Sequence, residues 1–140
     1  MTVHEVKIWL RQYRKIQREI KDIELRITQL RLKFGMPSAI NYSDMPKGCG
    51  NGADLADYMA ALEEYEQILK ARRMACIELL KQYSKAIEHL DYDEAYVIRR
   101  RYLDGARWVQ IAMETPCSER TVYYIHGHAL QRLQSIAETM

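Results

Sequence analysis

Residues 102–133 decide the fold, and they read YLDGARWVQIAMETPCSERTVYYIHGHALQRL. Gly105 ends one helical stretch, Pro116 ends a second, short one, and Ser118 is placed to cap a third. Apolar residues at helical spacing are Trp108, Ile111 and Ala112 in the short stretch, and Val122, Ile125, Ala129, Leu130 and Leu133 in the longer one. We expect helices at 91–105, 106–117 and 118–138, of which the last two form a helix-turn-helix.

Two longer amphipathic segments precede this region. From Val6 to Phe34 the apolar residues follow steps of three and four, and no proline or glycine interrupts residues 2–34. Such a heptad-like stripe is typical of a coiled coil. Helical spacing resumes at Leu55 and continues to Leu90. The residues between, 35–53, contain four of the six glycines and two of the three prolines, so we expect a loop there.

The charge distribution favours pairing of the two long segments. Residues 1–34 carry nine Lys/Arg against four Asp/Glu, whereas residues 53–90 carry five against seven. We therefore expect an antiparallel helical hairpin over 1–90, either within one chain or between two copies, in which case the protein is a homodimer. Residues 91–140 are nearly neutral, with six Arg against seven acids. The predicted fold is all-α: a coiled-coil-like N-terminal hairpin followed by the helix-turn-helix domain 91–140.

The composition also indicates where the protein works. The three cysteines are far apart and odd in number, which favours a reducing compartment without a disulfide framework. No apolar run approaches the roughly 18 residues that a membrane span needs, and the N-terminus lacks the apolar stretch of a signal peptide. We expect a cytoplasmic protein with no membrane partner.

The C-terminal region resembles the last DNA-binding domain of bacterial sigma factors. The residues that follow the family pattern are Tyr102, Gly105, Trp108, Ile111, Ala112, Ser118, Val122, Ala129, Leu130 and Leu133. Over nearly its full length, including YSDMPKG (42–48) and DLADYM (54–59), the chain is similar to phage late transcription regulators of the ArpU/RinA type. This resemblance implies activation of packaging, structural or lysis genes together with bacterial RNA polymerase, in the host cytoplasm. Arg107 departs from the pattern, because a capping Ser or Thr usually stands there.

The helix-turn-helix resemblance also predicts which side chains face double-stranded DNA. The apolar pattern points Val122 and Ile125 inward, and the N-terminal end of such a helix reads base edges in the major groove. Arg120 suits guanine O6 and N7, and Glu119 suits cytosine N4. The full predicted set is Arg107, Ser118, Glu119, Arg120, Thr121, Tyr123 and Tyr124. Which of the two tyrosines faces DNA stays open at this point, as do the operator sequence and the sign of regulation.

Other kinds of site find little support in the sequence. His126 and His128 are two residues apart, so on a helix they point about 200° away from each other and do not share a metal. No nucleophile motif or spaced carboxylate pair indicates an enzyme, so we expect no catalytic residues, no cofactor and no small-molecule substrate. We interpret Gly127 as a site of close packing against a neighbouring helix.

Two other functions fit the same elements. A phage DNA-packaging protein similar to a small terminase subunit also joins a helix-turn-helix to helices that oligomerise. A sigma-like protein that binds RNA polymerase without reading bases is the other alternative.

Overall fold

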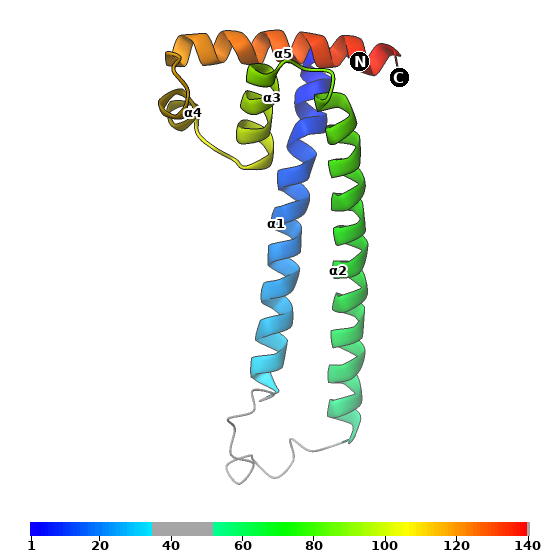
Figure 1. The fold of residues 1–140 in the computed structure, drawn as a ribbon. Helices are drawn as coiled ribbons and strands as arrows, with labels where there is room; N and C mark the ends of the chain where they lie inside the picture. The colour runs from blue at the N-terminus through cyan, green and yellow to red at the C-terminus, as the bar shows by residue number, and fades with distance from the viewer. Residues whose placement is uncertain (35–51, 140) are drawn as a thin grey trace. The chain divides into compact units, whose positions relative to one another are not determined.

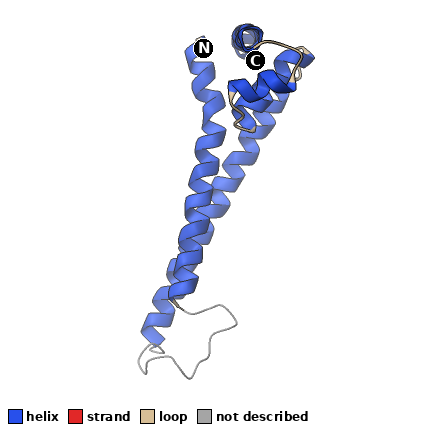
Figure 2. Ribbon diagram, turned by 90° about the vertical axis from the view of Figure 1, so that its left-hand side faces the viewer, coloured by secondary structure: helices blue, strands red, loops and turns tan. Residues whose placement is uncertain are grey.

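The computed structural model describes residues 1–34 and 52–139, and these residues are helical apart from short connections (Figure 1 and Figure 2). The elements are α1 (Val3–Lys33), α2 (Gly52–Ile87), α3 (Tyr92–Ile98), the single π-helical turn η2 (Arg99–Leu103), α4 (Trp108–Glu114) and α5 (Glu119–Thr139). The protein is all-α, as predicted. The expected loop 35–53 lies outside the described residues except for its last two, which already belong to α2.

The chain divides into two compact units. One, the C-terminal unit, combines Met1–Gln17 with Cys76–Met140, and the other, the hairpin unit, is Arg18–Ala75. These units differ from the expected domains 1–90 and 91–140. The physical reason is that the apolar stripes at the start of α1 and the end of α2 pack with α3 and α5 in one core.

The core of the C-terminal unit joins four α-helices and the π-helical turn η2. Figure 1 shows α5 crossing α3 and the adjoining ends of α1 and α2. The buried residues of this core are Val6, Leu10, Tyr83, Ala86, Ile87, Ala95, Ile98, Tyr102, Ala129, Leu130 and Leu133. The Tyr83 hydroxyl donates a hydrogen bond to the carbonyl of Trp9, and the two rings meet edge to face with centroids 4.7 Å apart. Burial of this apolar surface is the main force that fixes α5 on its neighbours.

A second, smaller core holds the helix-turn-helix together. Val97 of α3, Ala106, Ile111 of α4 and Val122 of α5 are buried against one another. As predicted, Trp108, Ile111 and Ala112 lie on the inner face of α4, with Ile111 fully buried. This core gives α4 and α5 a fixed mutual geometry.

The helix expected over 91–105 is interrupted near its end. Regular α-helix stops at Ile98, and a π-helical turn follows, in which the amide of Asp104 donates to the carbonyl of Arg99. Gly105 then adopts φ +73°, a left-handed conformation that side-chain-bearing residues rarely take. Gly105 therefore ends the helix, as the sequence predicts.

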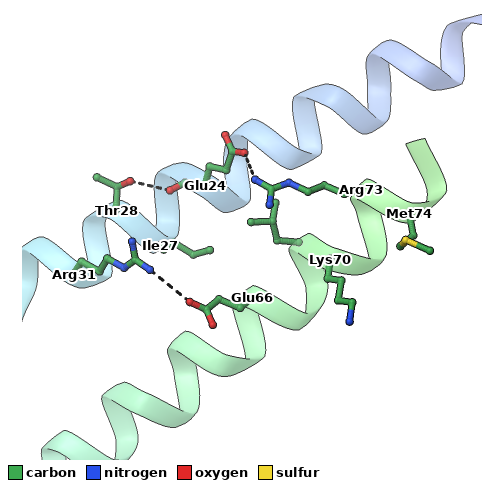
Figure 3. Close-up of a pocket in the computed structure, with 9 residues that line it drawn as sticks. Glu24, Ile27, Thr28, Arg31, Glu66, Lys70, Arg73 and Met74 are labelled. Carbon is green, nitrogen blue, oxygen red and sulfur yellow. Dashed lines mark hydrogen bonds and ion pairs between the residues drawn. The ribbon is translucent and has the colours of Figure 1, made fainter. Parts of the chain in front are cut away.

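The hairpin unit contains the remaining parts of α1 and α2, which run antiparallel within one chain. Ile27, Tyr58 and Leu69 are buried in the described part of this unit, and the rings of Phe34 and Tyr58 stack 4.4 Å apart. Figure 3 shows the groove between the helices at Ile27, beside which two ion pairs lie.

Three ion pairs link the helices of this unit, and all are largely exposed. They are Arg31–Glu66 at 3.5 Å, Arg73–Glu24 at 2.9 Å and Arg72–Glu19 at 3.4 Å. In two of the three, α2 supplies the arginine, so the pairing is not simply that of a basic helix with an acidic one. Since exposed pairs contribute at most about 1 kcal/mol each, apolar contacts dominate the stability of the hairpin.

Candidate nucleic-acid interface

A four-residue turn separates α4 from α5, and Ser118 closes it. The Ser118 Oγ accepts a hydrogen bond from the amide of Thr121 at 3.2 Å and lies 3.0 Å from the Thr121 hydroxyl. The predicted N-cap is thus confirmed. Both side chains are exposed but face each other, so their first role is to hold the start of α5.

The start of α4 lacks such a cap. Arg107 occupies the N-cap position, and its side chain makes no capping hydrogen bond. This agrees with the expected loss of a cap at this position. The Arg107 side chain is exposed, so its guanidinium stands in solvent at the N-terminal end of α4.

Two faces of α5 differ in burial. The buried face consists of Val122, His126, Ala129, Leu130 and Leu133. Ile125, predicted to point inward, is half-buried. The exposed residues at the N-terminal end are Glu119, Arg120, Thr121, Tyr123 and Tyr124, all from the predicted set. The structure therefore brings these five side chains together on one end of one helix.

The two adjacent tyrosines have different surroundings. Tyr123 is 46% exposed, packs against the Trp108 ring at 4.8 Å, and donates a hydrogen bond to the Glu119 carboxylate at 3.2 Å. Desolvation, together with the Glu119 carboxylate, raises the pKa of Tyr123. Tyr124 is 75% exposed. Tyr123 is thus held in place and orients Glu119, whereas Tyr124 presents most of its ring to solvent.

His126 lies in the core, which the sequence reasoning missed. Its Nε2 is 2.7 Å from the Tyr102 hydroxyl, and its ring meets Trp108 edge to face. Burial lowers the pKa of His126 to about 4, and the positive charges of Lys7, Arg101 and Arg11 act in the same direction. The signal was present in the sequence, because position 126 lies four residues from both Val122 and Leu130 in the apolar stripe.

Gly127 is not a packing contact. It is exposed, and a Cβ added there would meet no atom within 4 Å. The prediction of close packing is therefore wrong, because residue 127 lies on the outer side of α5. It lines a shallow surface hollow with Tyr123, Tyr124, His128 and Gln131.

Several arginines near the helix-turn-helix are engaged in ion pairs. Arg100 binds Glu114 at 2.6 Å and Asp104 at 3.1 Å. Arg132 binds the buried Glu94 at 2.9 Å and Asp91 at 3.1 Å. Arg100 thus links η2 to α4, and Arg132 links α5 to α3.

Within residues 1–34 and 52–139, neither Arg107 nor Arg120 forms an ion pair with a carboxylate. Arg99 is exposed. Across the same residues, no group of three His, Cys, Asp or Glu side chains is placed to hold a metal ion.

Comparisons with protein families, characterised proteins and solved structures find no match to this chain. Among the helices that the structure describes, none is both long and apolar enough to cross a membrane.

Proposed function

We propose that the protein is a sequence-specific regulator of transcription that binds double-stranded DNA with α5 as its recognition helix. One observation carries the proposal: five polar or aromatic side chains are exposed at the N-terminal end of α5, while the opposite face of the helix is buried. A recognition helix needs this division, because the scaffold must hold it rigidly while its first turns enter the major groove.

Each exposed residue has a role that its chemistry suits. Arg120 donates two hydrogen bonds to guanine O6 and N7, and Glu119, oriented by Tyr123, accepts from cytosine N4. Tyr124 contacts a thymine methyl group or a phosphate. Arg107 binds phosphate from the start of α4, and the cap formed by Ser118 places the first turn of α5.

The resemblance to phage late regulators extends the proposal. It makes the protein an activator of packaging, structural or lysis genes that acts with bacterial RNA polymerase in the host cytoplasm. The exposed Val109 and Met113 on α4 support a protein contact next to the recognition helix, since they are 56% and 82% exposed. The proposed partner of these two side chains is a subunit of RNA polymerase.

A second copy of the chain is the other proposed partner. Among the described residues of the hairpin unit, six large apolar side chains are more than one-third exposed: Leu25, Leu32, Leu55, Met59, Ile68 and Met74. A homodimer through these helices would present two recognition helices to two half-sites and double the number of phosphate contacts. Sedimentation equilibrium measures the mass directly: a dimer supports this arrangement, and a ring-sized mass favours the packaging-protein alternative.

Selection of bound duplexes from a random pool tests the proposed function. The proposal predicts enrichment of one site, and Arg120→Ala should lower discrimination at one base pair by about 1–3 kcal/mol. Lys81→Ala is the matched control, because it removes one exposed positive charge from α2. A pool that stays random, with polymerase binding intact, would favour the sigma-like protein without base readout.

A further inference from the structure

The C-terminal helices carry few positive charges that could bind the DNA backbone. Phosphate neutralisation supplies much of the free energy of DNA binding. Residues 91–140 contain six arginines against seven acids. Arg100 and Arg132 are occupied by ion pairs. The C-terminal helices alone therefore offer few positive charges to the DNA backbone.

The first turns of α1 bring further positive charges to the same unit. Residues 1–17 contain four Lys/Arg and one acid. The guanidinium of Arg14 lies directly on Gly105, where it fills the space that a Cβ would occupy. Gly105 stands two residues before Arg107, so α1 places a cation at the turn that leads into α4.

Arg101 lies at the same turn. Its guanidinium stacks over the Trp108 ring at 4.6 Å from the centroid, and Nη1 donates a hydrogen bond to the carbonyl of Ala106 at 3.2 Å. Arg14 and Arg101 thus contact residues 105–108, and Arg107 is itself one of these residues. They come from α1, η2 and the start of α4.

Lys7 and Arg11 continue this arrangement along α1. Lys7, Arg11 and Arg14 follow i, i+4, i+7 spacing, which places them on one face of the helix. Arg11 and Arg14 are exposed, and Lys7 is half-buried. Burial and, to a smaller extent, the positive charges of Lys7, Arg101 and Arg11 lower the pKa of His126.

Across residues 1–34 and 52–139, none of Lys7, Arg11, Arg14, Arg101 and Arg107 forms an ion pair with a carboxylate. Asp104, the acid next to Gly105, is bound by Arg100. A patch of five unpaired cations therefore adjoins the recognition helix through Trp108, whose ring contacts Tyr123.

We infer that Lys7, Arg11, Arg14, Arg101 and Arg107 form a phosphate-binding strip that holds the DNA backbone beside the recognition helix. This inference rests on the proposed function and names the residues that supply its sequence-independent affinity. Phosphate contacts fix register and orientation without reading sequence. The strip therefore raises affinity for all duplexes equally, whereas Arg120 and Glu119 provide discrimination.

The salt dependence of binding tests the strip with the full chain. The probes are a duplex of random sequence and the duplex selected from the random pool. For Arg11→Gln combined with Arg14→Gln, the slope of log affinity against log salt should fall by about 2, since each lost phosphate contact removes about 0.9. The ratio of affinities for the two duplexes should not change. Arg11→Lys combined with Arg14→Lys keeps the charge and should keep the slope.

Lys81→Gln combined with Lys85→Gln is the control, because it removes the same charge from an exposed part of α2 outside the strip. The strip is refuted if this control lowers the slope as much as the Arg11/Arg14 pair, or if that pair keeps the wild-type slope. In either case the proposed function is still supported if Arg120→Ala lowers the ratio of affinities for the selected and the random duplex. Wild-type protein that binds neither duplex would refute both. If the Arg11/Arg14 glutamine pair does not fold, Lys7→Gln gives the same test, with an expected change of about 1.

Discussion

The hydroxyl of Tyr102 and Nε2 of His126 lie 2.7 Å apart in the core of the C-terminal unit. Tyr102 belongs to η2 and His126 to α5, so the hydrogen bond joins the turn before the helix-turn-helix to its longer helix. Trp108 of α4 packs against the same imidazole. The geometry of α5 relative to α4 and η2 therefore depends on a neutral histidine.

The stability of the fold should depend on the protonation of His126. Burial lowers its pKa to about 4, below the ordinary value of 6.5. Between these values the unfolded chain binds a proton that the folded chain does not. The stability that the neutral His126 contributes is thus fully present above pH 6.5. As the pH falls toward 4, the free energy of unfolding decreases by up to about 3 kcal/mol. Urea unfolding across this range measures it.

Two substitutions isolate this effect from the other titrating groups. His126→Gln should flatten the fall in stability between pH 6.5 and 4. His4→Gln removes an exposed imidazole at the start of α1 and should leave the fall unchanged. An equally steep fall in the His126→Gln protein would contradict the assignment.

Loss of the α5 cap should destabilise the recognition helix. Ser118→Ala removes the oxygen that accepts a hydrogen bond from Thr121, and we expect a cost of about 1 kcal/mol. Ser135→Ala, in the same helix, is the control, because the Ser135 hydroxyl bonds only the carbonyl of Gln131. Denaturant unfolding compares the two, and equal costs would argue against a capping role.

Glycine-to-alanine substitution should have opposite signs at two positions. Gly127→Ala places a methyl group in open space on a helix and should stabilise by about 1 kcal/mol. Gly105→Ala forces an alanine to φ +73° and displaces the Arg14 guanidinium, so it should destabilise by about 1–2 kcal/mol. Melting temperatures that change in the same direction for both would contradict this account.

Removal of Arg132 should leave a buried carboxylate without its partner. Glu94 is 5% exposed, and Arg132 is its closest ion-pair partner at 2.9 Å. We expect Arg132→Met to lower the melting temperature by about 5 °C, against less than about 2 °C for Arg31→Met, whose pair with Glu66 is exposed. Adding Glu94→Gln to Arg132→Met should recover part of the lost melting temperature. If nothing is recovered, the unpaired Glu94 carboxylate is not the cause of the loss.

Local signals in the sequence predicted the helices and their ends. Ser118 caps α5 and Gly105 ends the preceding turn, because each depends on the conformation of a few neighbouring residues. The inward position of Val122 followed from helical spacing. The DNA-facing roles assigned to the exposed residues of α5 stay predictions.

Local sequence patterns did not predict the contacts between segments that are distant in the chain. Tyr102 and His126 are 24 residues apart, and Arg14 meets Gly105 across most of the chain. Neither pairing follows from composition or spacing. The wrong prediction at Gly127 has a local cause. His126 belongs to the buried stripe of α5, and this places residue 127 on the outer face of the helix. The packing of α1 against α3 and α5 was not expected either, because helical spacing does not show which amphipathic helices share a core.

The most direct measurement of the central claim is the affinity ratio between the duplex selected from a random pool and a duplex of random sequence, at one fixed salt concentration. We expect a ratio of about 10³ or more for the wild-type protein. For Arg120→Ala we expect this ratio to fall by about 5- to 150-fold, which corresponds to 1–3 kcal/mol, and for Lys81→Ala we expect no change. A ratio near one for the wild-type protein, or one that Arg120→Ala leaves unchanged, would contradict base reading by α5.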